Sequence, residues 1–179
     1  MEEAAPQILS KLNELGPTVS VDFNIGVEAY FDTLTALIDR FCNKKKLSLI
    51  YISITVPSST IMSALQSLEI DTSKIRFVDC ISFATMECAG TDDAQTVYVE
   101  SPTMLEYIVL KMEYLFRKGK GEQFMVILDS VNSLAAHNEV RMLYEFMQVL
   151  MASAKSRGAY PIILSMEDQM KPELHEMLQ

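Results

Sequence analysis

The sequence lacks the features of a membrane-spanning or secreted protein. Its longest apolar runs, such as residues 47–56, are interrupted by Ser and Thr and fall short of the roughly 18 residues that a membrane-spanning helix needs. The N-terminus carries Glu2 and Glu3 instead of the basic segment and apolar core of a secretory signal. We therefore expect no association with a membrane and a cytoplasmic location.

Cysteine and histidine are too few and too scattered to predict a metal site. The three cysteines, Cys42, Cys80 and Cys88, show no CxxC spacing, and the only histidines are His137 and His175. Structural zinc sites usually need four such ligands at short, regular spacing. An odd number of cysteines in apolar or mixed surroundings is typical of reduced thiols in a cytoplasmic protein. We expect the histidines to be solvated or capping residues, because no nucleophile motif accompanies them.

Positive charge is also scarce. The chain has 15 Lys and Arg against 24 Asp and Glu, a formal net charge of -9, which opposes binding to nucleic acid because phosphate contacts need basic side chains. Two short basic runs lie at residues 44–46 and 117–120. Both fall where we expect helices to end, and cations there interact favourably with the helix dipole and the free carbonyls. We therefore predict a structural role for both runs and no nucleic-acid partner.

The composition is that of one globular domain. The chain has 179 residues, 49% of them hydrophobic, which is enough for one substantial core. Residues 6–15 carry apolar side chains at helical spacing before Gly16 and Pro17, which stop a helix. We expect an N-terminal amphipathic helix within residues 1–17 and a single α/β domain over residues 18–179. The helix can pack on this domain or on another chain.

Predicted strands alternate with predicted helices along that domain. Apolar and β-branched runs predict strands at residues 19–23, 47–54, 75–78, 97–99, 124–129 and 160–165. Helical spacing predicts helices at residues 28–42, 59–68, 102–116 and 139–156, with a partly helical tail over 167–179. We expect Ser58 or Ser59, Ser101 and Asn138 to be helix N-caps. This alternation predicts a three-layer αβα fold with a mainly parallel central sheet.

The segment Phe-Met-Val-Ile-Leu-Asp at residues 124–129 is expected at the centre of the sheet. Five apolar residues followed by one carboxylate are typical of a strand buried on both faces, with Asp129 at its carboxyl end. Ligands of open α/β sheets bind at that edge, so Asp129 can meet a metal-bound phosphate or another polar ligand. Alternatively, Asp129 is the N-cap of the segment that follows. Asp79 and Ser165 are expected near the same edge.

The order of these segments resembles that of the RecA-like ATPases, most closely the KaiC-like branch found widely in archaea. FMVILDS followed by NSL is similar to the Walker B strand, with Asp129 and Ser130 as the Walker B-like residues. LSLIYISI and LEIDTSKIRFVDCIS resemble that branch's second strand and the segment leading to the next. The resemblance covers residues 19–166 and implies a RecA-like core with the Asp129 strand in the centre. The strand at 160–165 would lie next to it, with the strand at 19–23 beyond. In an unrelated flavodoxin-like or receiver-like sheet, the Asp129 strand would have different neighbours.

The phosphate-binding loop that this resemblance implies is degenerate. A Walker A loop, GxxxxGK[ST], needs glycines to wrap the phosphates, a lysine to neutralise them and a hydroxyl for magnesium. The corresponding residues 24–33 contain one glycine and no lysine. Glu28 and Asp32 put negative charge in the first helical turns, which repels a triphosphate. If nucleotide binding survives, the residues expected to contact the nucleotide are Asn24, Gly26, Glu28 and Thr33.

The other parts of an ATPase site are missing as well. The family usually places a glutamate after the second strand to orient the attacking water, whereas this sequence runs Ile-Thr-Val-Pro at residues 54–57. Tyr30 and Phe31 are too bulky for a loop that approaches a ligand closely. Phosphoryl transfer depends on positioning and charge neutralisation, so we predict no catalytic residue and no enzyme activity. Asp129 alone would be a weak magnesium site, so we expect neither a metal nor ATP as a cofactor.

Two functions from different classes follow from this reading. The first is a catalytically inactive RecA/KaiC-like domain, a pseudo-ATPase, with a regulatory or scaffolding role through protein–protein association. Its partner would be itself or an active ATPase relative. The second is a nucleotide-binding sensor or weak ATPase that uses a remodelled pocket at the carboxyl ends of the strands. Asp79, Asp129 and Ser165 would line that pocket.

Overall fold

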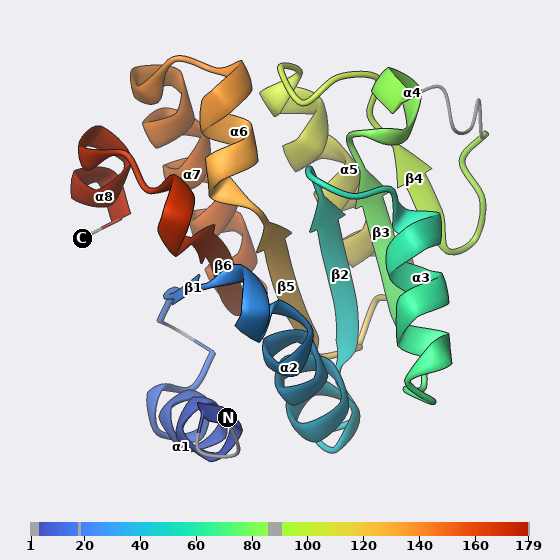
Figure 1. Ribbon diagram of the computed structural model, residues 1–179. Coiled ribbons are helices and arrows are strands. Elements are labelled where there is room, and N and C mark those ends of the chain that lie inside the picture. Colours follow the sequence, from blue (N-terminus) through green and yellow to red (C-terminus); the bar gives the residue numbers. More distant parts are fainter. Residues whose placement is uncertain (1–3, 18, 86–90, 179) are drawn as a thin grey trace.

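The computed structural model describes residues 4–17, 19–85 and 91–178 (Figure 1); Cys88 lies outside these ranges. The strands are β1 (Val21–Ile25), β2 (Ser48–Ser53), β3 (Ile75–Asp79), β4 (Thr96–Tyr98), β5 (Phe124–Asp129) and β6 (Tyr160–Met166). The helices are α1 (Ala4–Leu15), α2 (Tyr30–Thr35), α3 (Ser58–Ser67), α4 (Ser82–Thr85), α5 (Leu105–Lys118), α6 (Val131–His137), α7 (Val140–Ser156) and α8 (Pro172–Leu178). The π-helical segment η2 (Ala36–Asn43) continues α2, and η1 (Val27–Ala29) and η3 (Glu167–Gln169) are short 3-10 turns.

The six strands form one parallel sheet in the order β1-β6-β5-β2-β3-β4. The Asp129 strand, β5, lies between β6 and β2, and β1 lies beyond β6. These are the neighbours that the resemblance to RecA-like proteins implies. The prediction of a mainly parallel sheet with residues 124–129 at its centre is confirmed.

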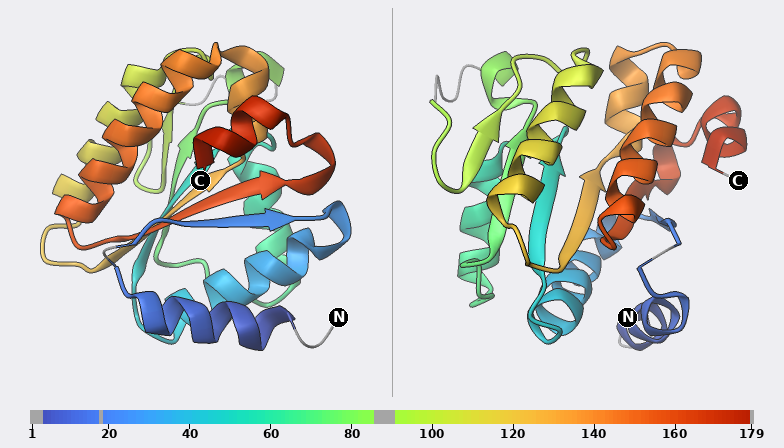
Figure 2. Two further views of the ribbon diagram at one scale, coloured as in Figure 1. Left: turned by 90° about the vertical axis from the view of Figure 1, so that its left-hand side faces the viewer. Right: turned by 180° about the vertical axis from the view of Figure 1, so that it is seen from behind.

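Helices cover both faces of the sheet (Figure 2). Val126 and Leu128 of β5 pack in the cluster that includes α5 and α7, whereas Met125 and Ile127 pack in the cluster that includes α1, α2 and α3. All four side chains are fully buried, as expected of a central strand whose successive side chains point to opposite faces. The predicted three-layer αβα architecture is confirmed.

The N-terminal helix packs on its own domain. Leu12 of α1 is 1% exposed and belongs to the same core cluster as Ile38 and Phe41 of η2. Ile8 and Leu9 pack against this cluster. Of the two positions expected for this helix, the structure shows packing on its own domain.

The predicted N-caps differ from the observed helix starts. Ser58 is the first residue of α3, after Pro57 at the N-cap, and its hydroxyl donates to Asp79. The helix expected after Ser101 begins only at Leu105. The Ser58 hydroxyl thus binds the buried Asp79 carboxylate instead of capping the helix.

The cap predicted for the last long helix is also wrong. Asn138 lies one residue before the N-cap of α7, which is Glu139. Its Nδ2 donates instead to the carbonyl oxygens of Leu134 and Pro102. Asn138 therefore joins the end of α6 to the segment before α5.

Within the described residues, no helix combines the length and the apolar character that a bilayer crossing requires. The described cysteines, Cys42 and Cys80, are free and buried. Burial raises the pKa of the Cys42 thiol to about 12 and that of Cys80 well above its ordinary value. Both side chains are therefore protonated core residues, in agreement with the expectation of structural thiols.

The end of α3 provides a test of local backbone strain. Glu69 has a φ of 56° and is exposed, a conformation that disfavours residues with a Cβ by about 1–2 kcal/mol and that glycine adopts freely. We expect Glu69→Gly to raise the free energy of unfolding by about 1 kcal/mol in urea denaturation. Glu69→Ala keeps the Cβ while losing the carboxylate and should give no gain. An equal gain in both variants would mean that charge, and not backbone conformation, limits stability here.

Candidate functional site

The turn between β1 and the helical segment formed by η1 and α2 is very short. Only Gly26, with φ −73° and ψ 154°, separates β1 from η1, and the Ala29 N–H donates to its carbonyl oxygen at 3.0 Å. A phosphate-cradling loop needs several backbone N–H groups that wrap the phosphates before the helix begins. Residues 24–33, all described by the structure, instead pass from strand to helix through one extended residue.

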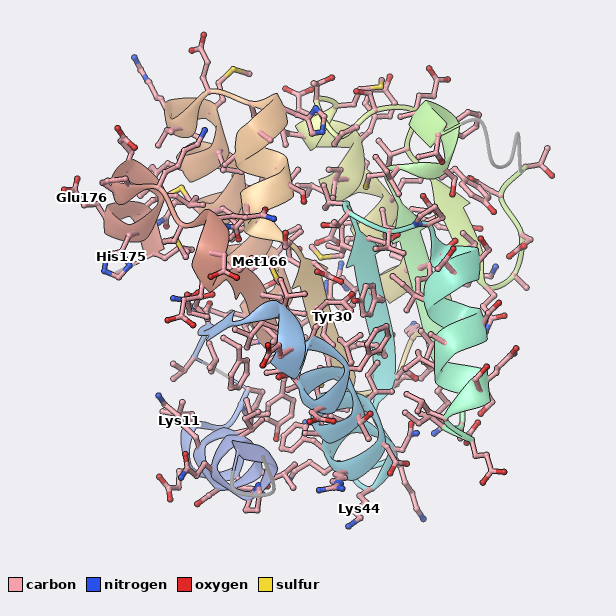
Figure 3. All side chains as sticks on the ribbon, viewed as in Figure 1. Lys11, Tyr30, Lys44, Met166, His175 and Glu176 are labelled. Atoms are coloured by element: carbon pink, nitrogen blue, oxygen red, sulfur yellow. The ribbon has the colours of Figure 1, made fainter. Side chains whose placement is uncertain are left out.

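Tyr30, the first residue of α2, reaches across to the carboxyl end of β5 (Figure 3). Its hydroxyl donates to Oδ2 of Asp129, and the Tyr51 hydroxyl of β2 donates to the same oxygen. The two hydroxyl oxygens lie 3.2 Å apart. Two phenols from different elements thus converge on one carboxylate oxygen.

The electrostatics of this Tyr30–Tyr51–Asp129 cluster follow from its burial. Asp129 is 2% exposed; burial raises its pKa, and the hydrogen bonds from the two tyrosines only partly offset this. Burial and the nearby carboxylate raise the pKa values of Tyr30 and Tyr51 well above 10. Among the described residues, no Lys or Arg forms an ion pair with Asp129. The carboxylate is therefore held by neutral hydroxyl donors.

Ser130, not Asp129, is the N-cap of α6. Its hydroxyl accepts a hydrogen bond from the Ser133 N–H at 3.4 Å, and the Asp129–Ser130 peptide bond is cis. Thr55, after β2, is hydrogen-bonded to Ser133 at 2.7 Å. The alternative in which Asp129 caps this helix is wrong, because the Asp129 side chain is engaged by the tyrosines.

The four residues expected to contact a nucleotide lie on β1, on the turn, on η1 and on α2. Asn24 and Glu28 are exposed, Gly26 is half-buried, and Thr33 is 3% exposed within α2. A Cβ at Gly26 would lie 3.9 Å from Glu167 Oε2, so another carboxylate lies beside the turn.

Asp79, at the end of β3, has a separate structural role. It is fully buried and accepts five hydrogen bonds: from the N–H and hydroxyl groups of Ser58 and Ser82 at 2.6–2.9 Å, and from the Ile81 N–H at 3.0 Å. Burial alone would raise the Asp79 pKa, but the bonds from the two serines lower it overall. Asp79 therefore joins β3 to the first turns of α3 and α4.

Among the described residues, the side chains of Asp79, Asp129 and Ser165 share no hydrogen-bond partner. Ser53 of β2 is paired in the sheet register with Asp79 on one side and with Asp129 on the other, so the two carboxylates lie on strands either side of β2. The Ser165 hydroxyl donates to Asp22 Oδ1 at 2.8 Å. The structure thus gives each of the three residues its own partners.

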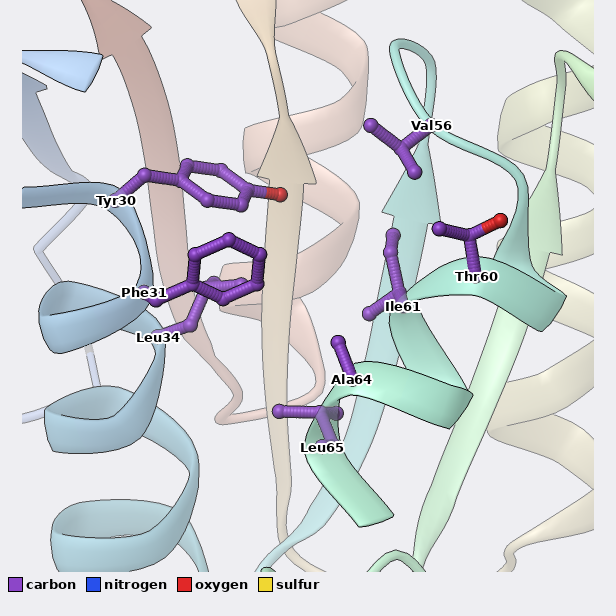
Figure 4. Close-up of a pocket in the computed structure, with 8 residues that line it drawn as sticks. All are labelled: Tyr30, Phe31, Leu34, Val56, Thr60, Ile61, Ala64 and Leu65. Atoms are coloured by element: carbon purple, nitrogen blue, oxygen red, sulfur yellow. The ribbon is translucent and has the colours of Figure 1, made fainter. Parts of the chain in front are cut away.

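A small apolar cavity lies between α2 and α3 beside the tyrosine cluster (Figure 4). Its volume is about 50 Å³, and its lining residues are Tyr30, Phe31, Leu34, Val56, Thr60, Ile61, Ala64 and Leu65. Ligand sites usually have volumes of roughly 300–1,000 Å³. This cavity is too small for a nucleotide, and neither Asp79, Asp129 nor Ser165 lines it.

The histidines and other ligand-type side chains form no metal cluster in the described ranges. There, no group of three or more His, Cys, Asp or Glu residues is placed to hold an ion. His137 is in the last turn of α6. Burial raises the pKa of Asp22, and the hydrogen bond from Ser165 and the nearby His175 of α8 offset this only in part.

Comparisons with known proteins identify the fold. No protein-family model and no curated protein matches the sequence. Among solved structures, the chain is similar to a KaiC-like protein from the archaeon Pyrococcus horikoshii, with a TM-score of 0.61 and 12% identity over 91% of this chain and 68% of that chain. It is also similar to an uncharacterized protein of the same organism, solved in complex with an unknown peptide, with a TM-score of 0.68 and 12% identity over 96% of this chain and 79% of that one. The chain therefore has a RecA/KaiC-like α/β core.

The residues that sequence reasoning missed are Tyr30 and Tyr51 as partners of Asp129. The sequence marks Tyr30 only as a bulky residue near the helix start and Tyr51 as one residue of a buried strand. The available signal was the side-chain alternation along β2, which places Tyr51 on the same face of the sheet as Ile127 of β5. That face also carries Asp129, two residues further along β5.

The opposite pKa shifts of Asp129 and Asp79 predict opposite pH dependences. Asp129 has a raised pKa, so its ionisation destabilises the folded protein as pH rises from about 3.8 through the raised value. The stability of the wild type relative to Asp129→Asn should therefore fall between pH 4 and pH 7. Urea denaturation across this pH range measures the difference.

Asp79 supplies the control, because its pH dependence of stability should have the opposite sign. Its pKa is lowered, so its stabilising effect is present above the ordinary value of 3.8 and is lost as pH falls through the lower folded-state pKa. We expect Asp79→Asn to destabilise by about 2 kcal/mol at pH 7, since hydrogen bonds to charged groups contribute about that much, and by less near pH 3. Matching pH profiles for the two variants would contradict both assignments.

Proposed function

We propose that this chain is a catalytically inactive RecA/KaiC-like domain with a regulatory or scaffolding role through protein–protein association. The observation that carries the proposal is the pair of tyrosine hydroxyls on Asp129 Oδ2. In P-loop ATPases the corresponding aspartate holds the magnesium ion beside the phosphates. Here Tyr30, the first residue of α2, places its phenol against that carboxylate.

The charge around the β1–α2 turn supports the same proposal. Glu28 and Asp32 lie in the first turns of the helix, and Glu167 lies beside Gly26. A triphosphate would approach three carboxylates where the ATPases supply a lysine and backbone N–H groups. The alternative function, a nucleotide sensor or weak ATPase, would require Tyr30 to leave Asp129 and the turn to open.

The outer face of two helices supports an association role. Tyr107, Leu110 and Tyr114 of α5 and Met142 and Val149 of α7 are 43–59% exposed. The spacing within each set places its members on one side of their helix. We call these five residues the α5–α7 patch. Exposed apolar patches of this kind mark interaction sites.

The two helices that carry this patch pack against each other. Glu113 of α5 accepts hydrogen bonds from Ser153 of α7 and from Arg157, the residue after α7, the latter at 2.8 Å. The two helices therefore lie side by side, as the rear view in Figure 2 also shows. The partner we propose is a second copy of this chain or an active ATPase relative, and the peptide bound to one structural neighbour is consistent with protein binding.

The inactivity can be tested with ATP and magnesium. We expect no phosphate release above the buffer blank and no change in the amide NMR signals of residues 24–33, because Tyr30 occupies the position beside Asp129. Magnesium-dependent turnover that Asp129→Asn abolishes would disprove the proposal. So would sub-micromolar ATP binding that shifts the signals of residues 24–33.

Self-association can be tested by size-exclusion chromatography with light scattering. We expect the wild type to elute as a dimer or larger assembly and a Leu110→Asp/Val149→Asp variant to elute as a monomer, because burying two carboxylates at an interface is strongly unfavourable. Leu68→Asp, at a position 51% exposed just after α3, should leave the assembly intact. A monomeric wild type, or equal dissociation by Leu68→Asp, would contradict association of copies through the α5–α7 patch.

A further inference from the structure

A second, larger cavity lies at the opposite edge of the sheet, where β5 begins. Its volume is about 490 Å³ and its lining residues are Phe116, Arg117, Gly119, Lys120, Gly121, Glu122, Phe124 and Arg157. We call it the amino-edge groove. It is formed by the end of α5, the turn to β5 and the residue after α7, so the Tyr30–Tyr51–Asp129 cluster, at the carboxyl edge, is not part of it.

The fold itself explains why basic residues gather at this edge. Every strand of the sheet is parallel, so the helices that lead into β2, β5 and β6 all end here. Lys44 follows η2 at the lower edge of the view in Figure 3, and Arg117 and Lys118 lie in the last turn of α5. The predicted placement of both basic runs at helix ends is thus confirmed, since cations there stabilise the helix dipole.

Several of these cations are already engaged. Arg76 donates to both carboxylate oxygens of Glu122 at 3.0 and 3.1 Å. Arg157 donates to Glu113, and its guanidinium lies 5.9 Å from the centre of the Phe116 ring. These contacts hold two guanidinium groups in fixed positions near the groove.

Arg117 and Lys120 are different. Both side chains are exposed and line the groove. In the described part of the chain, neither forms a hydrogen bond or an ion pair, whereas the neighbouring Lys118 lies over the Tyr114 ring at 5.8 Å. Two positive charges therefore line the groove without a partner among the residues that the structure describes.

The local charge favours an anion even though the whole chain carries -9. Around the groove, the four cations Arg76, Arg117, Lys120 and Arg157 meet two carboxylates, Glu113 and Glu122. The C-termini of α5 and α7 add roughly half a negative charge each. About one positive charge remains uncompensated, in a concave site where such an excess attracts anions.

The size of the groove is that of a small-molecule site, because its volume falls within the roughly 300–1,000 Å³ range of such sites. Phe116 and Phe124, packed edge to face at 5.0 Å, lie behind its polar side chains, and each is only 3% exposed. A Cβ at Gly119 would lie 2.5 Å from Phe124 Cζ and from Arg76 Nη1. The backbone turn therefore packs directly on the Phe124 ring and on Arg76, and a side chain at Gly119 would disturb this packing.

We propose that the amino-edge groove binds a small organic anion that carries a phosphate group. Arg117 and Lys120 bind the phosphate, because a guanidinium fork and an ammonium are the side-chain groups suited to it. This site is separate from the proposed pseudo-ATPase site and does not depend on it.

Isothermal titration at low salt tests the site with AMP, ribose 5-phosphate and inorganic phosphate, and with adenosine as the uncharged comparison. We expect AMP to bind and adenosine not to bind. Arg117→Ala/Lys120→Ala should weaken AMP binding at least about tenfold, since it removes two charge-assisted contacts. Tighter binding of AMP or ribose 5-phosphate than of inorganic phosphate would support an organic phosphate as the ligand. Equal binding of all three would overturn it, because the groove would then recognise phosphate alone.

The matched control is Arg40→Ala/Lys44→Ala. It removes one Arg and one Lys, both exposed, from the end of η2, outside the groove, and should change the affinity by less than about twofold. The proposal is overturned if no phosphate probe binds at millimolar concentration, if both double variants weaken binding equally, or if adenosine binds as well as AMP. AMP in the groove leaves the amide signals of residues 24–33 unchanged, so this result and the ATP test can fail independently.

Discussion

The arrangement of α2, β2 and β5 at the carboxyl edge of the sheet depends on the buried carboxylate of Asp129. A carboxylate placed in an apolar strand end destabilises the fold by several kcal/mol unless it receives hydrogen bonds. Here the donors are phenols from α2 and β2, so one charge ties three elements together. Because Tyr30 is the first residue of α2, this contact holds the start of that helix against the carboxyl end of β5.

The carboxyl edge of the sheet is used for structure at a second position. Asp79 receives five hydrogen bonds from residues around the starts of α3 and α4, and this makes its pKa shift opposite to that of Asp129. In open α/β sheets this edge normally meets the ligand. In this chain its two buried acidic residues both hold helices in place.

The sequence predicts the sheet well and the details of the site poorly, for physical reasons. The strand at 124–129 is predicted to the residue, because a continuous apolar run is a local signal of a doubly buried strand; the sheet order came from the family resemblance. The helix starts at Ser101 and Asn138 are wrong for different reasons. The Ser101 hydroxyl binds Thr103 in a local turn, whereas Asn138 donates to the Pro102 carbonyl, a tertiary partner that no local pattern reveals. The pairing of Tyr30 with Asp129 spans 99 positions, and the amino-edge groove joins segments that only the folded chain brings together. Contacts of this kind depend on topology.

The parallel sheet also gives the molecule a long-range property. With several helices ending at one edge, Lys and Arg collect there, while acidic residues such as Glu28, Glu106 and Glu167 lie in turns and helix starts at the other. The side chains at these helix ends thus oppose the partial charges of the helix dipoles at both edges. A charged molecule within roughly one Debye length, about 8 Å at physiological salt, senses such local charge before any contact forms. Added salt shortens this distance, so electrostatic attraction of an anion to the amino edge weakens as the ionic strength rises.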